Sequence, residues 1–301
     1  MSVVVTGAAG FIGRVLVDQL VAAATPVVAV DRRAMPDVAG VTVLTADLLA
    51  RDAMVETALR EADAVVHLAG CPGVRDRGAD VEQRRERDNV ETVRLLSGLV
   101  PADVPLVVVS SSSVYGGVRH GRACRETDTP HPTGGYARSK HRAERLCGVR
   151  ADAGGHALVV RPFTVVGERQ RADMALSRWT ESALAGEPLH VYGSLDRTRD
   201  VTCVREVARG LRALVTAGAT GTVNLGSGRP RSLREIVTAL AVALGVDVQV
   251  RVEDAADCEV ADTWADMARF AGLTGFTPHT DLDDVARRFL AARSGLLAVG
   301  G

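Results

Sequence analysis

Tyr136 and Lys140 are the two residues whose types and spacing most directly suggest chemistry in this chain. Lys140 is the only lysine among 301 residues, and every other residue in the basic total of 36 is an arginine. Residues four apart on a helix lie on one face, so this spacing places a phenol beside an ammonium group. The positive charge favours the phenolate, which would let Tyr136 exchange a proton near neutral pH. A chance pair on a solvated helix is the alternative, but an arginine-biased chain that keeps one lysine here favours the chemical interpretation.

A run of four serines, from Ser110 to Ser113, follows the apolar segment 106–109. Such a run is usually only a polar loop. Here it follows a predicted buried strand, so it should lie at the carboxyl edge of the sheet, where α/β proteins bind their ligands. The run therefore predicts a hydroxyl group that polarises a substrate oxygen close to Tyr136.

The first predicted strand, residues 3–6, leads directly into a glycine turn and the start of a helix. Glycines allow the backbone to turn sharply and to approach a pyrophosphate, whose charge lies at the helix N-terminus. Asp31 ends the second predicted strand, where its carboxylate would accept hydrogen bonds from the adenosine ribose. The sequence therefore predicts a dinucleotide site and favours NAD. The glycine turn consists of Gly7, Ala8, Ala9, Gly10, Phe11, Ile12 and Gly13.

The neighbouring charges leave details of the cofactor open. Arg32 and Arg33 follow Asp31, and an arginine there could hold the 2′-phosphate of NADP; solvated loop charges are the alternative. Asp47, which precedes Leu48 after the third predicted strand, could accept a hydrogen bond from the adenine amino group or could cap a helix. We expect NAD and keep NADP as the alternative.

Short apolar, β-branched runs alternate with helix-length segments in the first half of the chain. This pattern is typical of a parallel sheet covered by helices on both faces, and it predicts a Rossmann-type doubly wound α/β fold. After residue 165 the rhythm changes, and we expect residues 166–199 and 229–301 to form a smaller mixed α/β substrate lobe. Residues 200–228 should return to the cofactor domain formed by residues 1–165. The predicted strands cover residues 3–6, 27–30, 41–44, 64–68, 106–110, 157–160 and 222–225.

Composition and charge argue against several other classes of protein. A net charge of −1 provides no field for binding nucleic acid or a membrane surface. The apolar runs are strand-sized, so no segment is expected to span a bilayer, and the early first strand leaves no room for a signal peptide. The five cysteines show no C-x-x-C spacing, which indicates free thiols in a reducing cytoplasm and no metal site. We therefore expect a soluble cytoplasmic protein.

Taken in order, the glycine turn, the serine run and the Tyr136/Lys140 pair resemble the extended short-chain dehydrogenase/reductase family. Within this family the chain is most similar to nucleotide-sugar 4-epimerases. The resemblance covers nearly the whole chain. It continues through His67-Leu68-Ala69, Asn89-Val90, Arg161-x-Phe163-Thr164, Arg171-x-Asp173-Met174-Ala175, Arg199-Asp200, Val223-Asn224 and Trp264-Ala265-Asp266.

The resemblance implies a catalytic set of Ser111, Tyr136 and Lys140. Tyr136 would take the proton of the sugar C4 hydroxyl while a hydride passes to the nicotinamide, and Ser111 would bind the same oxygen. Lys140 would hold the ribose and lower the pKa of Tyr136. The 4-keto sugar would then turn over and take the hydride back on its other face. The implied cofactor contacts are Gly7, Gly10, Phe11, Ile12, Gly13, Asp31, Arg32, Asp47, Leu48, Leu68, Ala69, Asn89, Ser110, Tyr136, Lys140 and Pro162. The implied substrate contacts are Arg75, Ser111, Ser112, Ser113, Tyr136, Thr164, Arg171, Val191 and Arg199.

The serine run separates relatives by their chemistry. Family 4,6-dehydratases carry an Asp-Glu pair in this loop and decarboxylases of UDP-glucuronate carry a Glu, whereas this chain has Ser112 and Ser113. Redox at C4 without elimination or decarboxylation is therefore expected. Three details resemble UDP-glucuronate 4-epimerases: the segment that ends at Arg75, the residue Thr164, and the segment that begins at Arg171. Hydroxyl groups and an arginine also suit a sugar carboxylate. Neutral UDP-hexoses stay open as substrates, and Arg75 could instead be a mobile loop charge.

Some positions depart from the pattern of the family. The arginine that grips the diphosphate in relatives is missing near residues 255–259. Arg205, Pro162 and Glu168 stand where relatives have aspartate, tyrosine and proline. The nucleotide could therefore be held differently, or could be other than UDP.

The resemblance also implies a homodimer. Relatives pair two subunits through the helices that correspond to residues 82–99 and 136–150. Both segments are rich in arginine in this chain.

Three hypotheses of function remain. The leading one is an NAD-dependent UDP-sugar 4-epimerase with no net use of cofactor. The second is an NAD(P)H-dependent 4-ketoreductase of a deoxysugar nucleotide, which Arg32 and Arg33 keep open. The third is an NAD-binding protein without catalysis, which the missing diphosphate arginine supports and the retained Lys140 opposes.

Overall fold

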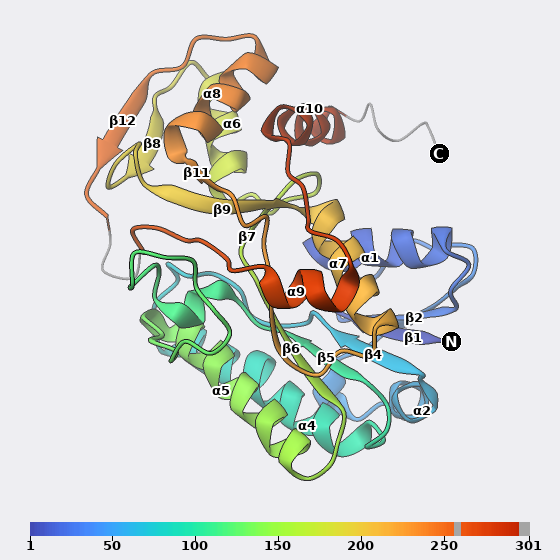
Figure 1. Cartoon of the computed structure of the whole chain (residues 1–301). Coiled ribbons are helices and arrows are strands. Elements are labelled where there is room, and N and C mark those ends of the chain that lie inside the picture. The colour runs from blue at the N-terminus through green and yellow to red at the C-terminus, as the bar shows by residue number, and fades with distance from the viewer. Residues whose placement is uncertain (256–259, 295–301) are drawn as a thin grey trace.

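Seven parallel strands form the central sheet of the part of the chain that the structure describes, residues 1–255 and 260–294 of a computed structural model (Figure 1). These strands are β1 (Val3–Thr6), β2 (Val27–Asp31), β3 (Val41–Thr45), β4 (Ala64–His67), β5 (Leu106–Val109), β6 (Ala157–Pro162) and β10 (Gly221–Leu225). Their order is β10-β6-β5-β4-β1-β2-β3, so the direction of winding reverses between β1 and β4. The carboxyl ends of these two strands flank the crevice in which such sheets bind ligands. The predicted Rossmann-type fold is confirmed.

Helices and short strands fill the rest of the described chain. The helical elements are α1 (Phe11–Ala22), η1 (Leu48–Ala50), α2 (Ala53–Glu61), α3 (Ala79–Arg85), η2 (Glu86–Glu91), α4 (Thr92–Leu99), η3 (Ser112–Tyr115), α5 (Gly134–Asp152), α6 (Ala175–Leu184), α7 (Val204–Thr216), α8 (Leu233–Leu244), α9 (Ala268–Thr274) and α10 (Leu282–Arg293). The remaining strands are β7 (Thr164–Val166), β8 (Leu189–Tyr192), β9 (Thr198–Cys203), β11 (Pro230–Ser232) and β12 (Val250–Glu253).

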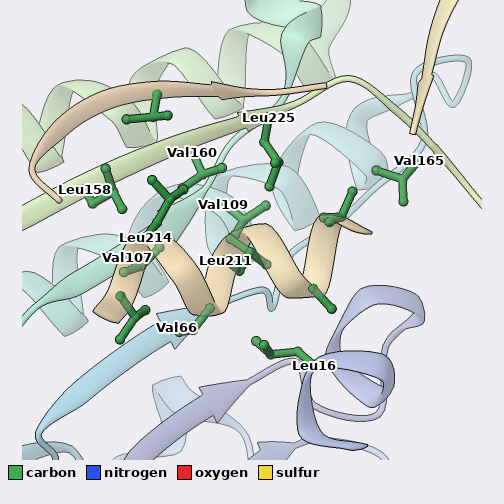
Figure 2. Packing of buried hydrophobic residues seen from close by; sticks show 14 of the residues in the cluster. Leu16, Val66, Val107, Val109, Leu158, Val160, Val165, Leu211, Leu214 and Leu225 are labelled. Carbon is green, nitrogen blue, oxygen red and sulfur yellow. The ribbon is translucent and has the colours of Figure 1, made fainter. Parts of the chain in front are cut away.

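Different helices cover the two faces of the sheet, because successive residues of a strand point to opposite sides. Val3 and Val5 belong to the core under α1 and α7, whereas Val4 belongs to the core under α2, α4 and α5. Figure 2 shows Leu211 and Leu214 of α7 packed against the strands of the first face. Truncation of a buried leucine such as Leu211 to alanine typically costs about 2–5 kcal/mol. The uninterrupted apolar strands are thus explained by burial on both sides.

A second lobe lies beyond the carboxyl edge of the main sheet, above it in Figure 1. It contains the three-stranded sheet β11-β9-β7 and the parallel pair β12-β8. Helices α6, α8 and α10 pack on these strands around a separate apolar cluster that includes Trp179, Leu240 and Phe289. Helix α8 begins at a capping box in which Ser232 and Glu235 bind each other's backbone N–H groups.

The chain passes between the two lobes more than once. Helix α9 follows the second-lobe elements β11, α8 and β12, yet it packs on β10 and α7, and its Phe270 is fully buried in the core of the main sheet. Residues beyond 228 therefore contribute to both lobes. Among the described residues, no helix has the length and apolar character needed to cross a membrane.

Candidate active site

A cleft of about 1790 Å³ opens between the carboxyl edge of the main sheet and the second lobe. Its walls include the glycine turn after β1, the serine run after β5 and the phenol of Tyr136 on one side, and Trp179 and Tyr192 on the other. Every residue expected at the cofactor or the substrate lines this cleft except Asn89 and Val191. The structure thus brings together side chains that lie up to two-thirds of the chain apart.

The glycine turn forms a backbone cradle at the N-terminus of α1. Gly7 has a φ of 72°, and a side chain there would collide with the backbone of Leu68 and Ala69 after β4. Helix α1 has neither a side-chain cap at Gly10 nor an acidic residue in its first turn. Its first backbone N–H groups are therefore available to an anion, as a pyrophosphate requires. The turn fits a dinucleotide.

Asp31 stands beside this cradle at the end of β2. Its Oδ2 accepts a hydrogen bond of 3.0 Å from Ala9 N, and its Oδ1 accepts one of 2.9 Å from Arg33 N. Oδ1 also accepts a long bond of 3.5 Å from Arg33 Nε, whereas Oδ2 has a second lone pair with which Asp31 can accept a bond from a ribose hydroxyl. The position of Asp31 therefore suits NAD.

Asp47 serves as a helix cap in this structure. Its Oδ1 accepts a bond of 3.0 Å from Leu49 N at the start of η1, and its Oδ2 pairs with the guanidinium of Arg87. The carboxylate also lines the cleft next to Leu48. Of the two predicted roles for Asp47, capping is confirmed, and contact with an adenine stays a prediction.

Asn89 does not reach the cleft, although it was expected at the cofactor. It lies buried on the π-helical turn η2, where Oδ1 accepts a bond of 2.8 Å from Cys71 N and Nδ2 donates to Cys71 O and Ser139 Oγ. A side chain at Gly70 would come within 2.5 Å of Asn89 Oδ1. Asn89 thus holds the loop after β4 against α5 and acts on the cleft only through that loop.

Tyr136 and Lys140 lie one turn apart near the start of α5, and both line the cleft. The Tyr136 hydroxyl is hydrogen-bonded to Ser111. Burial of the phenol raises the pKa of Tyr136 above its ordinary value, while the bond with Ser111 and the charge of Arg171 lower it less strongly. Among the charges, those of Arg171 and Arg85 lower this pKa, and burial outweighs them. The expectation that Lys140 lowers it stays a prediction.

Lys140 is itself buried beneath the loop after β4. Its Nζ donates a hydrogen bond of 2.9 Å to Val109 O, and an added Cβ at Gly70 would lie 3.4 Å from Nζ. Burial lowers the pKa of Lys140 to about 8, and the neighbouring Glu144 opposes this shift. A compact ammonium fits this space, whereas a planar guanidinium is bulkier. The single lysine of the chain thus occupies a site that selects against arginine.

The serine run turns into η3 directly beside Tyr136. Ser111 caps this short helix by accepting a bond of 3.2 Å from Ser113 N. The hydroxyl oxygens of Ser110 and Ser113 are buried without a hydrogen-bond partner among the described residues. Ser112 and Thr164 also line the cleft. This wall of the cleft therefore offers a ligand several hydroxyl groups. Two of them, buried and without a hydrogen-bond partner in the described part of the chain, are available to bind it.

Arg171 adds a positive charge to the same wall. Its Nε and Nη2 donate to Asp173 at 2.8 and 2.7 Å, and its charge lowers the pKa of Tyr136. The ion pair engages one edge of the guanidinium and leaves Nη1, within the described part of the chain, for a ligand. Arg171 thus combines with the serine run to form a site suited to an anion or a polyol.

The other predicted substrate residues have more varied positions. The guanidinium of Arg75 lies 4.4 Å from the ring centre of Tyr192, a contact that spans the cleft from one lobe to the other. Arg199 donates to the backbone carbonyls of Thr198, Val260 and Ala261, so it holds this part of the chain together at the edge of the cleft.

Val191 is not at the cleft, in contrast to the expectation. It lies fully buried in the core of the second lobe. The alternation of side chains along β8 turns Val191 inward and directs its neighbours His190 and Tyr192 to the cleft. Tyr192, one of three tyrosines, is a cleft residue that the sequence reasoning missed; strand parity after Leu189 was the signal that could have found it.

The departures from the family pattern have structural counterparts. Pro162 lines the cleft at the end of β6. Arg205 and Glu168 form an ion pair with each other. The segment in which the diphosphate arginine is missing, residues 255–259, lies largely outside the residues that the structure describes, 1–255 and 260–294.

A doubly wound parallel sheet whose switch point holds a glycine turn, next to a Ser/Tyr/Lys set at the carboxyl edge, defines an extended short-chain dehydrogenase/reductase. The chain belongs to the NAD dependent epimerase/dehydratase family, which matches residues 3–226. The prediction of an NAD-dependent enzyme of this type is confirmed.

Individual relatives agree with this assignment. UDP-glucuronic acid 4-epimerase from Bacillus cereus, solved in complex with UDP-glucuronic acid and NAD, is 28% identical, with a TM-score of 0.89 over 98% of this chain and 100% of that one. MoeE5, solved in complex with UDP-glucuronic acid and NAD, is 34% identical, with a TM-score of 0.87 over 99% of this chain and 100% of that one. GDP-6-deoxy-D-mannose reductase from Pseudomonas aeruginosa is 30% identical in an alignment 305 positions long that covers 95% of this chain and 95% of that one. The matches support a nucleotide-sugar 4-epimerase and include a reductase.

Proposed function

We propose that this protein is an NAD-dependent epimerase that inverts C4 of a UDP-sugar, with UDP-glucuronate as the substrate that the cleft suits best. The observation that carries the proposal is the gathering of Ser111, Tyr136 and Arg171 at one wall of the cleft. A proton acceptor, a hydroxyl on the same oxygen and a fixed cation are what oxidation and reduction at a sugar C4 need.

The chain's residues divide the work of the reaction. Tyr136, as the phenolate, accepts the proton of the C4 hydroxyl and later returns it to the same oxygen, which Ser111 holds by a hydrogen bond. Arg171 stabilises the phenolate, and Lys140 would bind a ribose. NAD, for which the glycine turn and Asp31 fit, would supply the hydride acceptor and donor. The sugar would turn over within the cleft, whose volume is about 1790 Å³, to present its other face.

The serine run supports C4 redox without further chemistry. Elimination of water requires an acid and a base near the sugar, and Ser112 and Ser113 stand where related dehydratases and decarboxylases carry carboxylates. Asp173, a carboxylate that lines the cleft, is paired with Arg171. The sugar nucleotide should therefore leave the site with its atoms unchanged and only C4 inverted.

Glucuronate is favoured over a neutral hexose by the chemistry of this wall. A C6 carboxylate would find hydroxyls from Ser113 and Thr164 and the Nη1 group of Arg171 within one site. MoeE5 has also been solved in complex with UDP-glucose and NAD, so a neutral hexose is the alternative substrate. A dTDP- or UDP-linked 4-keto-deoxysugar, reduced at the expense of NAD(P)H, is the second candidate function, favoured by the reductase among the relatives.

The test is to incubate the full chain with UDP-glucuronate, UDP-glucose and dTDP-glucose and to follow the sugar C4 proton by NMR. We expect interconversion of UDP-glucuronate and its C4 epimer without net change in NADH. Consumption of NADPH in proportion to product from a 4-keto sugar would contradict the proposal and support the reductase.

Tyr136→Phe should reduce turnover about 10²- to 10⁴-fold, as expected for loss of a general base, while NAD binding persists. Equal activity of Tyr136→Phe and wild type would favour a non-catalytic protein.

Tyr115→Phe is the matched control for this experiment. Its hydroxyl donates a bond of 2.7 Å to Asn224 in the core, and Tyr115 does not line the cleft. This variant should lower thermal stability and leave turnover within about twofold of wild type.

The assembly and compartment of the protein are also proposals. We propose a homodimer through the helical segments 82–99 and 136–150, which size-exclusion chromatography with light scattering tests; a monomeric mass would contradict it. We propose the cytoplasm as its location, which fractionation of the source cells tests.

A further inference from the structure

We infer that Asp88 sets the preference for NAD over NADP by binding Arg32 and so withholding its guanidinium from the 2′ position of the adenosine ribose. This inference rests on the proposed use of NAD and deepens it by naming a residue outside the glycine turn. Arg32 follows Asp31 directly, at the position from which an arginine can bind a 2′-phosphate. Whether the chain can use Arg32 in this way depends on what Arg32 already binds.

The contact between Arg32 and Asp88 is bidentate. Arg32 Nη2 donates to Asp88 Oδ2 at 2.9 Å, and Nη1 donates to Oδ1 at 3.3 Å. Nη1 also lies 4.0 Å from Asp47 Oδ2. The Asp88 side chain is only 8% exposed, whereas that of Arg32 is 52% exposed. A buried carboxylate binds a fork of N–H groups strongly, so Arg32 is fixed toward η2 although it could otherwise extend into solvent.

A second arginine balances the charges of this cluster. Arg87 Nη1 donates to Asp88 Oδ1 at 2.6 Å, and Arg87 also pairs with Asp47. Two carboxylates and two guanidinium groups therefore neutralise each other at this edge of the cleft. Arg33, the other arginine after β2, is directed to Asp31, whose Oδ1 accepts its backbone N–H at 2.9 Å and lies 3.5 Å from its Nε.

The π-helical turn η2 explains how Asp88 reaches Arg32. Residues Glu86–Glu91 are wound more widely than an α-helix, and three consecutive residues, Asp88, Asn89 and Val90, are buried. In a regular helix three consecutive residues would point in directions about 100° apart. Here Asp88 faces the end of β2, and Asn89 faces the loop after β4. π-helical turns are frequent at functional sites, and this one directs Asp88 to the edge of the cofactor cleft and Asn89 to the loop beside it.

The consequence for the cofactor is electrostatic. A 2′-phosphate would bring its negative charge close to Asp31, Asp47 and Asp88, all of which line the cleft. Arg32 and Arg87, the two arginines of the cluster, are already paired with these carboxylates, so neither would compensate that charge. NAD carries a hydroxyl at the 2′ position, and this hydroxyl can donate a hydrogen bond to a carboxylate.

The test compares direct binding of NAD⁺ and NADP⁺ to the full chain by isothermal titration calorimetry, after bound dinucleotide has been exchanged out by dialysis. Asp88→Asn keeps the shape of the side chain and removes its charge. We expect this variant to lower the ratio of the NADP⁺ to the NAD⁺ dissociation constant about tenfold, the value of one charge-assisted contact. The double variant Asp88→Asn with Arg32→Ala should return the ratio to the wild-type value, because the released Arg32 makes the new contact.

Two outcomes would overturn the inference. The first is a ratio for Asp88→Asn within twofold of wild type, and the second is a lower ratio that persists in the double variant. Arg32→Ala alone provides evidence even if Asp88→Asn fails to fold: it should leave NADP⁺ affinity unchanged, whereas about a tenfold loss would show that Arg32 already binds the 2′-phosphate. Asp128→Asn is the matched control, because Asp128 also binds an arginine through both oxygens, at 2.7 and 3.0 Å to Arg122, but lies outside the cleft. Wild-type protein that binds neither dinucleotide would contradict the proposed function instead.

Discussion

The carboxylate of Glu168 and the guanidinium of Arg205 form an ion pair that ties the loop after β7 to the first turn of α7. Both residues depart from the pattern of the family, in which proline and aspartate are usual. The Glu168 side chain is buried and that of Arg205 is half exposed. Each substitution alone would leave an unmatched charge, so the two departures compensate each other across the boundary between the lobes.

This pair should contribute asymmetrically to stability. Arg205→Ala leaves the buried Glu168 carboxylate without its cation, and we expect a loss of about 3 kcal/mol in the free energy of unfolding. Glu168→Gln leaves a half-exposed arginine that water can solvate, and the loss should be about 1 kcal/mol. Urea unfolding followed by circular dichroism measures both values.

An exposed ion pair serves as the control for this measurement. Arg234 and Asp196 lie 3.1 Å apart with both side chains largely exposed, and Asp196→Ala should change stability by less than about 1 kcal/mol. Equal losses in Arg205→Ala and Glu168→Gln would contradict the asymmetry.

Lys140→Arg should impair the enzyme although it keeps the positive charge. The Lys140 Nζ donates to Val109 O beneath Gly70, where the larger guanidinium would displace the loop after β4. We expect thermal stability to fall. Turnover should drop about 10²-fold, because the guanidinium at position 140 would also shift the phenol of Tyr136. Differential scanning calorimetry and the NMR assay measure the two effects. Wild-type turnover in Lys140→Arg would show that charge alone matters at this position.

Lys140 should also leave a signature in the pH dependence of stability. Its pKa is about 8 in the folded protein and 10.5 in the reference state, so between these values the unfolded chain binds more protons than the folded one. The free energy of unfolding of the wild type should therefore rise as the pH increases from about 8 to 10.5. Relative to Lys140→Met, the expected slope in this range is about 1.4 kcal/mol per pH unit. Parallel urea titrations of both proteins across this range test the slope. Coincident pH profiles would place the Lys140 pKa near its ordinary value.

Sequence reasoning succeeded where short-range pattern determines structure. The apolar runs identified all seven strands of the main sheet, and the glycine turn, the serine run and the Tyr136/Lys140 spacing identified residues that meet in the cleft. Each of these signals lies within a few residues of the chain. Their meeting point follows from the rule that parallel strands present their carboxyl ends at one edge.

It failed where the outcome depends on contacts between distant residues. Asp88, the partner of Arg32, lies 56 residues away on a π-helical turn, and no local sequence pattern predicts this contact. The pKa of Tyr136 depends chiefly on burial in the folded chain, which the spacing of two residues on one helix does not reveal. Val191 was misplaced for a simpler reason, since an error of one residue in strand parity reverses the side to which a side chain points.

Arg171→Met should discriminate between acidic and neutral sugars. Arg171 lines the cleft, and Asp173 holds the edge of its guanidinium formed by Nε and Nη2. A C6 carboxylate would lose a charge-assisted contact in the variant, and we expect kcat/KM for UDP-glucuronate to fall about 10²-fold. UDP-glucose lacks this charge. Its kcat/KM should therefore fall less, only because the Tyr136 phenolate is stabilised more weakly.

Arg169→Met is the control, because Arg169 also lines the cleft but pairs with Asp18 at the surface. This variant should turn over both substrates at near wild-type rates. Equal losses for the two sugars in Arg171→Met would mean that Arg171 acts only through Tyr136, and the preference for glucuronate would then have to be abandoned.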